Sequence, residues 1–273
     1  MVRSRVLVGL FLLSLLSPAV EAYKRKKRAG DKAFQNLAQI IRFLNENYLD
    51  HDQFAIAINI PAEKCSSHVK LDQNFLPGDS AWKVKRAMNS PAGVYGGWRL
   101  IGAKQKPIKE TSSYHPEYRL LIQSSPAGIA SYDPLLKKLL DKDKHGCVVF
   151  YVHNSPCVDS CSTPEGAYSI LPALDMLREH KGPKAFVFRE VQIHDVASTE
   201  KNENSEDLPF AQCFPSGERL YITMGYQEYF PRWISNIKAL NAKVPLYRCD
   251  RAQCQYCVHK NGEVDAKCMV NVW

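Results

Sequence analysis

The sequence predicts an α/β fold in which helices pack on a central mixed β-sheet, followed by a small cysteine-rich segment. Three observations lead to this prediction. Stretches with helical and with strand periodicity alternate along the chain. Two of the strand-like stretches, 147–152 and 185–191, are expected to be buried strands, and 147–152 is a continuous apolar run, which is typical of a strand buried on both faces. The last segment, 243–273, carries four cysteines and few residues that could form a core.

The first part of the folded chain predicts one helix and two strands. Apolar residues at helical spacing indicate a helix over 33–46. Residues 54–60 alternate and predict a strand that Pro61 ends. Residues 62–92 are rich in Pro, Gly, Ser and Asp, which favours a loop. A second strand is expected over 94–100, with a bulge at its internal Gly-Gly pair.

The second part begins with a helix at His115-Pro116, because proline is tolerated at a first helical position. Further elements follow from the same periodicities, and the stretch 195–209 is polar enough to predict a mobile loop. In chain order we expect a helix over 135–140, the strand 147–152, a helix over 167–180 broken or kinked at Pro172, the strand 185–191, a strand over 221–224 and a helix over 229–240.

The N-terminal residues have the features of a secretory signal peptide. Two arginines precede an apolar run over 6–16, and the small-residue pattern Val20-Glu21-Ala22 indicates cleavage after Ala22. The run is short for a transmembrane span, so we expect no membrane anchor. The predicted organisation is a signal peptide at 1–22, a basic linker or propeptide at 23–32, a domain of catalytic size at 33–242 and a cysteine-rich appendage at 243–273.

Positive charge is concentrated near the N-terminus. The chain carries a formal net charge of +8. The signal segment contributes +1, and the run 24–28 contributes five basic residues, so the folded body keeps only +2. The run is interpreted either as a solvated tail or as a site for secretory-pathway convertases. Because the body is nearly neutral, charge alone favours neither a nucleic acid nor a small substrate.

Nine cysteines are present, and in an oxidising compartment disulfides are the first expectation. The odd count leaves one thiol over, and Cys147, which opens an apolar strand, is predicted to be a buried free thiol. The four C-terminal cysteines favour two disulfides over a second zinc site. The sequence leaves the pairing open for the cysteines outside the motif described next, which are Cys65, Cys147, Cys213, Cys249, Cys254, Cys257 and Cys268.

Two short strings carry the candidate chemistry. The first is His115-Pro116-Glu117, and the second is Pro156-Cys157 with a second thiol at Cys161. One imidazole and two thiolates supply three zinc ligands and leave a fourth position open for water, as in catalytic zinc sites. Glu117, two residues after His115, can face the same cavity and carry protons.

The spacing of the two cysteines also bears on this site. Pro156 predicts that Cys157 begins a helix, where residues i and i+4 point the same way, so that Cys157 and Cys161 could reach one ion. In a secreted chain the alternative is a disulfide between these two cysteines without catalysis.

These strings resemble the zinc-dependent nucleobase deaminases, whose signature is H-x-E followed by P-C-x-x-C. The strand 150–157, Phe-Tyr-Val-His-Asn-Ser-Pro-Cys, is similar to the aromatic strand ending in S-W-S-P-C of the AID/APOBEC branch, which accepts two to four residues between its cysteines. With a signal peptide in front, the chain resembles the secreted AID/APOBEC-like deaminases. The resemblance implies a cytidine-deaminase-like layered fold over about 33–240.

The same resemblance implies roles for individual residues. His115, Cys157 and Cys161 would hold Zn²⁺, and Glu117 would be the proton shuttle. Residues implied to contact the substrate are Ser155, Asn154 and Arg189. Asn154 stands where the branch has tryptophan, so an aromatic platform is missing or is supplied elsewhere. Residues 162–166 interrupt a helix that is usually continuous, and 124–134 form the loop that absorbs a longer gap between the two strings.

The expected function is hydrolytic deamination of cytosine to uracil in single-stranded DNA or RNA outside the cell, as a defence activity. Two alternatives stay open. One is a deaminase of free nucleosides or nucleotides, which the near-neutral body fits equally well. The other is a secreted zinc-binding or signalling module without catalytic activity. The expected partners are therefore a polynucleotide or a nucleoside and no membrane, and the oligomeric state is left open.

Overall fold

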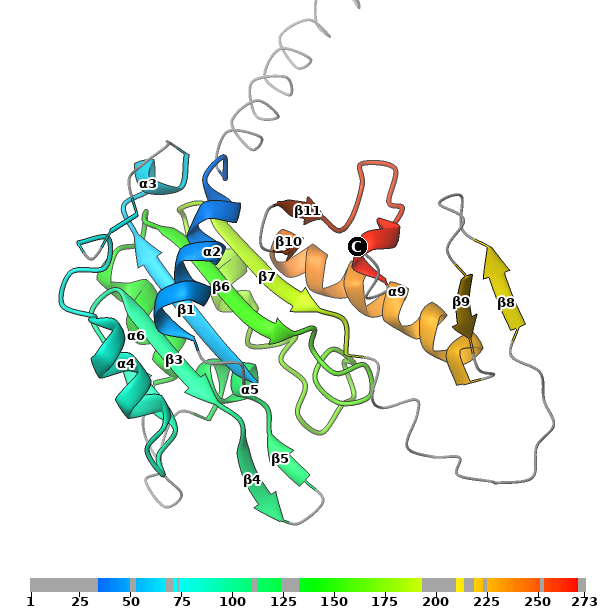
Figure 1. Ribbon diagram of the computed structural model, residues 1–273, viewed down its shortest axis with the longest axis horizontal. Coiled ribbons are helices and arrows are strands. Elements are labelled where there is room, and N and C mark those ends of the chain that lie inside the picture. The colour runs from blue at the N-terminus through cyan, green and yellow to red at the C-terminus, as the bar shows by residue number, and fades with distance from the viewer. Residues whose placement is uncertain are drawn as a thin grey trace, which may run out of the picture.

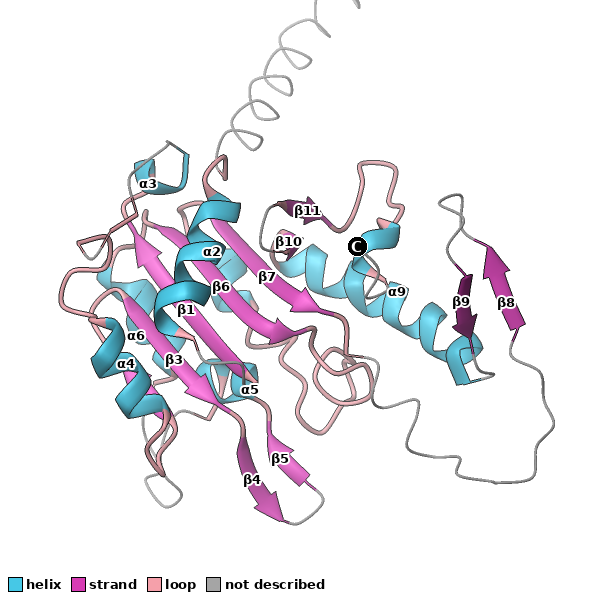
Figure 2. Ribbon diagram, viewed as in Figure 1, coloured by secondary structure: helices cyan, strands magenta, loops and turns pink. Residues whose placement is uncertain are grey.

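A computed structural model of the chain describes residues 34–49, 53–66, 71–72, 74–109, 112–123, 133–192, 210–213, 219–222, 225–250 and 253–269. The expected signal peptide, the basic run and the polar loop 195–209 lie outside these residues. The predicted α/β fold is confirmed: a central mixed sheet is flanked by helices on both faces (Figures 1 and 2). No helix of the described part combines the length and apolarity that a membrane crossing requires.

The central sheet has seven strands in the order β11-β10-β7-β6-β1-β3-β2. The pairs β6–β7 and β7–β10 are parallel, and the other neighbours are antiparallel. The strand expected over 54–60 is confirmed as β1, and all seven of its residues are buried. The strands are β1 (Phe54–Ile60), β2 (Val94–Gly96), β3 (Leu100–Lys104), β6 (Cys147–Asn154), β7 (Lys184–Glu190), β10 (Leu246–Cys249) and β11 (Cys254–Tyr256).

Each face of the sheet has its own apolar core. On one face, α2 (Leu37–Tyr48), α3 (Glu63–Ser66) and α4 (Ala81–Met88) cover the inward side chains of β1 and β6, such as Ile56 and Tyr151. The opposite core contains Phe150, Phe186 and Trp233. The helices that contribute to it are α5 (Pro116–Leu121), α6 (Leu135–Lys142), α7 (Asp175–Glu179) and α9 (Gly225–Lys243). Burial of both faces explains the continuous apolar run at 147–152 in β6 and the apolar centre of β7, residues 185–188.

Two hairpins lie outside the central sheet. The strands β4 (Lys106–Lys109) and β5 (Ser112–Tyr114) pair and lead directly into α5. The strands β8 (Phe210–Cys213) and β9 (Arg219–Ile222) pair before α9. The strand expected over 221–224 therefore belongs to a separate hairpin.

Three local expectations are corrected. The stretch 62–92 is not a continuous loop but contains α3 and α4, and α4 buries Val84 and Met88 at helical spacing. The strand expected over 94–100 is instead β2, a turn and β3. Asp79 causes this turn, because its carboxylate accepts the backbone N–H groups of Trp98 and Arg99. A Cβ at Gly97 would lie 1.8 Å from Asp79 Oδ1, so only glycine fits there.

The helix expected over 167–180 is shortened to α7, which begins at Asp175. Residues 161–174 form turns, and Pro172 has no N–H group to donate to a helix. The observed helix therefore begins after the proline instead of bending around it.

The prediction that Cys147 is a free thiol is wrong. Cys147 forms a disulfide with Cys65, 82 residues earlier, which joins α3 to the start of β6. The two disulfides expected near the C-terminus are confirmed as Cys249–Cys254 and Cys257–Cys268. The C-terminal segment also extends the sheet, because β10 pairs with β7. Cys213 lies in β8, whose side chains are outside the described part.

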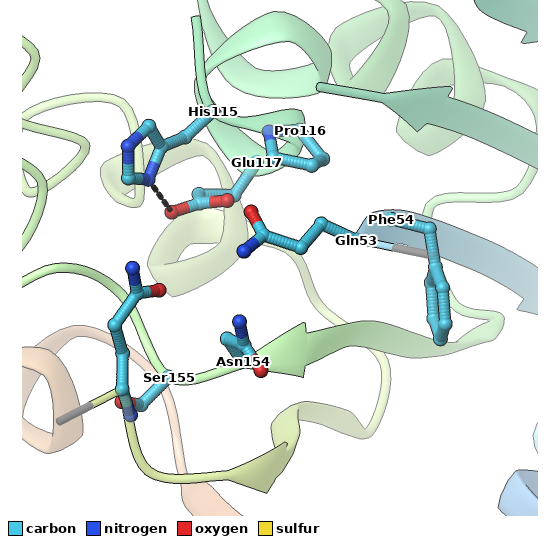
Figure 3. Close-up of a pocket in the computed structure, with 8 residues that line it drawn as sticks. Gln53, Phe54, His115, Pro116, Glu117, Asn154 and Ser155 are labelled. Atoms are coloured by element: carbon cyan, nitrogen blue, oxygen red, sulfur yellow. Dashed lines mark hydrogen bonds and ion pairs between the residues drawn. The ribbon is translucent and has the colours of Figure 1, made fainter. Parts of the chain in front are cut away.

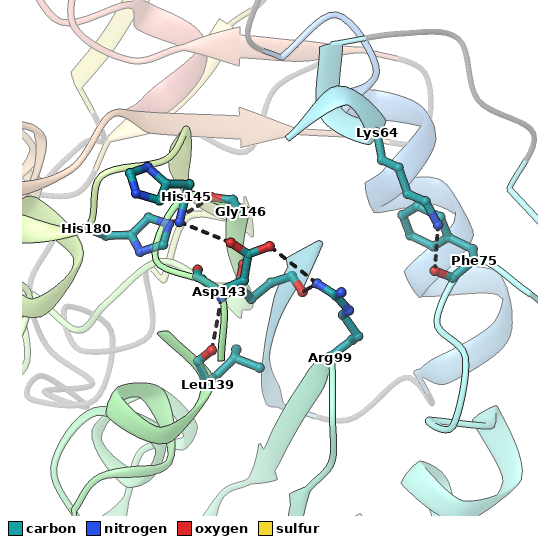
Figure 4. Close-up of polar contacts among 9 residues, drawn as sticks. Lys64, Phe75, Arg99, Leu139, Asp143, His145, Gly146 and His180 are labelled. Atoms are coloured by element: carbon teal, nitrogen blue, oxygen red, sulfur yellow. Dashed lines mark hydrogen bonds and ion pairs between the residues drawn. The ribbon is translucent and has the colours of Figure 1, made fainter. Parts of the chain in front are cut away.

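A polar network lies at the end of the sheet where β1 ends and β6 begins (Figure 4). The Asn59 amide donates to the carbonyls of Leu139 and Asp143, at 2.9 Å each, and so joins β1 to α6. His180 Nε2 lies 2.8 Å from the carbonyl oxygen of Gly146. The candidate site lies at the opposite end of these strands.

Candidate metal centre

A cleft opens where β1 begins and β6 ends (Figure 3). These strands are antiparallel neighbours, so the first residue of one and the last residue of the other lie at the same end of the sheet. The cleft has a volume of about 220 Å³ including its open mouth. Its lining consists of Gln53, Phe54, His115, Pro116, Glu117, Asn154, Ser155 and Gln192. The sequence singles out seven residues, and four of them line this cleft: His115, Glu117, Asn154 and Ser155.

The string His115-Pro116-Glu117 forms the start of α5, as predicted. His115 is the N-cap residue with φ −66° and ψ 150°, and Pro116 occupies the first helical position. This geometry directs Glu117 into the cleft, where it is only 4 % exposed. Its Oε1 atom lies 3.7 Å from Nδ1 of His115. The two groups therefore share one side of the cleft.

Arg119 fixes the position of α5 against the sheet. Its buried guanidinium donates to the carbonyls of Gly93, Ala92 and Lys104 at the β2–β3 hairpin. Burial lowers the pKa of this guanidinium. The three accepting carbonyls satisfy its donors, so the helix that carries Glu117 is tied to the hairpin through a buried charged group.

The second string does not begin a helix, which corrects the expectation for Cys157. The N–H groups of Cys161 and Ser162 both donate to the Cys157 carbonyl, at 3.1 and 2.9 Å, and form a single turn. The hydroxyls of Ser162 and Thr163 then donate to the carbonyls of Cys157 and Val158. Side chains that bond to backbone carbonyls in this way compete with helical hydrogen bonds. We call residues 157–163 the ligand turn.

The ligand turn still brings a thiol to His115 and Glu117. The imidazole nitrogen, a carboxylate oxygen and the Cys161 sulfur all lie within 4.8 Å of one another. Cys157 and Cys161 are buried thiols, whereas the other cysteines of the described part, which exclude Cys213, are in disulfides. Cys157 lies outside this 4.8 Å group, although it is close enough to contribute to raising the pKa of the Cys161 thiol.

The donor set suits zinc. One imidazole and two buried thiols, beside a buried carboxylate, are the donor types that zinc sites use. Burial raises the pKa of the Cys161 thiol, and the neighbouring Glu117 carboxylate raises it further. A bound cation opposes both effects, because it stabilises the thiolate and the carboxylate together. The residues present therefore fit a zinc ion.

Ser155 and Asn154 lie in the wall of the cleft opposite α5 (Figure 3). Ser155 is held tightly: its N–H donates to the Glu190 carbonyl at 2.7 Å, and its Oγ accepts the N–H of Gln192 at 2.9 Å. Arg189 is not among the lining residues. Its Nε atom lies 3.9 Å from Glu190 Oε1, and its carbonyl accepts from the buried Arg248.

Three lining residues carry no signal in the sequence. Gln53 precedes β1, and its carboxamide points into the cleft between Glu117 and Asn154 (Figure 3). Phe54 and Gln192 also reach the site only through strand pairing. The ring of Phe54 points away from the cleft and packs against Tyr151 and His153, so it does not replace the tryptophan that the chain lacks at Asn154 (Figure 3).

A cluster of three tyrosines joins α5 to the segment after the ligand turn. The rings of Tyr114 and Tyr118 stack at 5.7 Å, and Tyr168 contacts both edge-on at 5.7 and 5.5 Å. Tyr114 immediately precedes His115, so the cluster packs next to the first string. It provides contact between the two parts of the chain that carry the two strings.

Comparison with known proteins agrees with the site. The family described as Secreted Novel AID/APOBEC-like Deaminase 1 matches residues 34–215 and 217–272, which include both strings and the ligand turn. No curated protein and no solved structure matches the chain. The family match extends over nearly all of the folded part and agrees with the layered α/β fold. The chain therefore belongs to the secreted AID/APOBEC-like deaminase family.

Proposed function

We propose that this chain is a zinc-dependent hydrolytic deaminase that converts cytosine to uracil in single-stranded DNA or RNA. The proposed zinc ligands are His115, Cys157 and Cys161, and Glu117 is the proposed proton shuttle. The observation that carries the proposal is the placement of buried Cys161 within 4.8 Å of His115 and Glu117, in a chain whose other described cysteines, apart from Cys157, are disulfide-bonded. The family match supports deamination as the reaction.

Cys157 has to complete the ligand set. It shares the ligand turn with Cys161 and is 6 % exposed. Its carbonyl accepts the Cys161 N–H at 3.1 Å, so both thiols are carried by one turn. A zinc ion held by these residues supplies Lewis acidity, which makes water a nucleophile near neutral pH.

Glu117 performs the proton transfers in this proposal. Water adds to C4 of the ring, Glu117 accepts the proton that the water loses, and it passes a proton to N3. Glu117 then moves the proton of the new C4 hydroxyl to the amine. The C4–N4 bond breaks, and ammonia and uracil are released. The carboxylate is suited to this role because it is buried at the start of α5 and faces the cleft.

The rest of the cleft supports recognition of a single base. Its wall carries amide and hydroxyl groups from Gln53, Asn154 and Ser155, which can donate to and accept from the polar edge of a pyrimidine. An enzyme that acts on a base needs that base outside the duplex stack, which favours single-stranded substrates.

The proposal includes secretion. The three disulfides are typical of proteins that fold in an oxidising compartment, in agreement with a signal peptide at 1–22. We place the catalytic domain at 33–242 and the cross-linked C-terminal segment at 243–273. Deamination of foreign polynucleotides outside the cell would be a defence activity.

The test uses the purified full-length mature chain with four substrates, which are single-stranded DNA, single-stranded RNA, cytidine and cytidine monophosphate. We expect uracil in at least one polynucleotide, zinc at about one ion per chain by elemental analysis, and loss of activity after chelation. Activity on the free nucleoside or nucleotide alone would replace the polynucleotide assignment with the alternative substrate class. Bound zinc without deamination of any substrate would support the inactive zinc-binding module.

A further inference from the structure

We propose that Asn236 of α9 is a positioning residue that holds the ligand turn in the conformation that presents Cys157 and Cys161 to the metal. This inference rests on the proposed zinc site. It concerns a residue that lies 78 positions after Val158 in the sequence and outside both strings.

The side chain of Asn236 contacts three groups of the ligand turn. Its Nδ2 atom donates to the Val158 carbonyl at 3.0 Å, to Ser162 Oγ at 2.9 Å and to Thr163 Oγ1 at 3.3 Å. Asn236 is 6 % exposed, so these bonds form away from solvent. One carboxamide therefore donates to three acceptors on the buried side of the ligand turn.

The ligand turn depends on such support because it has no helix to stabilise it. In a continuous helix the Val158 carbonyl would accept the N–H group of the residue four positions later. Here the Val158 carbonyl accepts from Asn236 and from the Thr163 hydroxyl. A buried carbonyl left without such a donor destabilises the turn.

A second contact from the same helix acts on the surface side of the turn. Arg232, one helical turn before Asn236, forms an ion pair with Asp159. Residues i and i+4 of a helix lie on one face. The ligand turn is therefore held at its buried and its exposed sides by one face of α9.

The helix α9 is itself fixed to the C-terminal segment. Trp233 is completely buried, and its indole N–H donates to the Cys268 carbonyl at 3.1 Å. Cys268 is bonded to Cys257, which follows β11 in the central sheet. In Figure 1, α9 runs beside β7 and the C-terminal segment lies along it. The cross-linked segment thus gives Asn236 a rigid support.

The test compares Asn236→Ala with Asn241→Ala in the full-length chain. Asn241 is the matched control because it lies on the same helix and also makes a side-chain hydrogen bond, to the N–H of Leu246 at 3.1 Å, but does not contact the ligand turn. Zinc affinity is measured by competition with a chromophoric chelator. We expect Asn236→Ala to weaken zinc binding by about 10–100-fold, as for other residues that orient metal ligands, and Asn241→Ala to stay within about twofold of the wild type.

A second readout does not require zinc. In the metal-free chain with its disulfides intact, the rate of alkylation of Cys157 and Cys161 is measured by peptide mass spectrometry. We expect Asn236→Ala to accelerate alkylation by about tenfold or more, because opening of the ligand turn exposes a thiol that is now completely buried, and Asn241→Ala to leave the rate unchanged. Asn236→Leu, which keeps the volume and the helix propensity, serves if Asn236→Ala does not fold.

The outcomes separate the two proposals. If the wild type binds no zinc, the proposed function fails, and the alkylation rates still decide whether Asn236 holds the ligand turn. Equal zinc affinities and equal alkylation rates in the Asn236 and Asn241 variants would overturn the positioning role. A difference confined to Asn236 supports it.

Discussion

The Oε1 atom of Glu117 lies 3.7 Å from Nδ1 of His115, with Pro116 between them at the first position of α5. The proline is responsible for this relationship, because it allows His115 to keep extended backbone angles while Glu117 is already helical. An imidazole and a carboxylate two residues apart can therefore face one cleft with different roles. The imidazole binds the metal in our proposal, and the carboxylate carries protons.

Glu117→Gln is expected to reduce deamination by at least 10²–10⁴-fold, because the amide keeps the shape of the side chain and cannot accept a proton. Bound zinc should remain at the wild-type level, since Glu117 is not a proposed ligand. The measurement is uracil formation alongside elemental analysis of the same samples. Glu165→Gln, at an exposed position after the ligand turn, is the control and should retain wild-type activity. Full activity in Glu117→Gln would remove this residue from the mechanism.

Zinc binding is expected to strengthen as the pH rises. In the metal-free fold, burial and the Glu117 carboxylate raise the pKa of the Cys161 thiol, so the thiol is protonated at neutral pH. Zinc binds the thiolate, and each proton released on binding changes the affinity by about tenfold per pH unit. We expect zinc affinity, measured by chelator competition, to rise at least tenfold from pH 6 to pH 7.

The matched variant is Cys161→Ser, which lacks the thiol and should bind zinc more weakly at each pH. An affinity that does not change with pH in the wild type would show that no thiol is deprotonated on binding. In that case Cys161 could not be a ligand.

Much of the fold was predictable because local patterns determine it. The burial of β6 follows from its apolar run, the presence of β1 follows from its alternation, and the start of α5 follows from Pro116. The disulfide of Cys147 was not predictable, because its partner lies 82 residues earlier and only the packing of α3 on β6 brings them together. A contact between residues distant in sequence also determines the turn at Gly97, because the turn depends on hydrogen bonds to Asp79 in a preceding loop.

The candidate site divides in the same way. The four residues of the two strings are identified by residue type and spacing, but the conformation of the ligand turn depends on Asn236, which is distant in sequence. Gln53 and Gln192 reach the cleft because β1 begins, and the chain leaves β7, at the edge where β6 ends. Contacts of this kind have no local sequence signal.

The Cys65–Cys147 disulfide is expected to stabilise the fold more than Cys249–Cys254. Loop-closure entropy grows with loop length, and the two bridges span 82 and 5 residues. The entropic relation gives about 4.5 kcal/mol for the first bridge and about 2 kcal/mol for the second. Double serine variants of each pair, unfolded by urea with the other bridges oxidised, measure the two losses. A larger loss from the shorter bridge would indicate that packing, rather than loop closure, sets the contribution of each bridge.

His180 is expected to make the fold sensitive to mild acid. Burial lowers the pKa of its imidazole, and Nε2 lies 2.8 Å from the carbonyl oxygen of Gly146 at the end of the sheet where β6 begins (Figure 4). A lowered pKa in the folded state means that the neutral ring is stabilised by folding. Its contribution is therefore complete above the unfolded value of about 6.5 and is lost as the pH falls through the folded value. We expect the free energy of unfolding to decrease from pH 7 to pH 5, and to decrease less in His180→Gln, which keeps a donor for Gly146 without titrating. His259→Gln, whose side chain is 46 % exposed, is the control and should follow the wild-type curve. Coincident curves for the wild type and His180→Gln would mean that other groups cause the acid sensitivity.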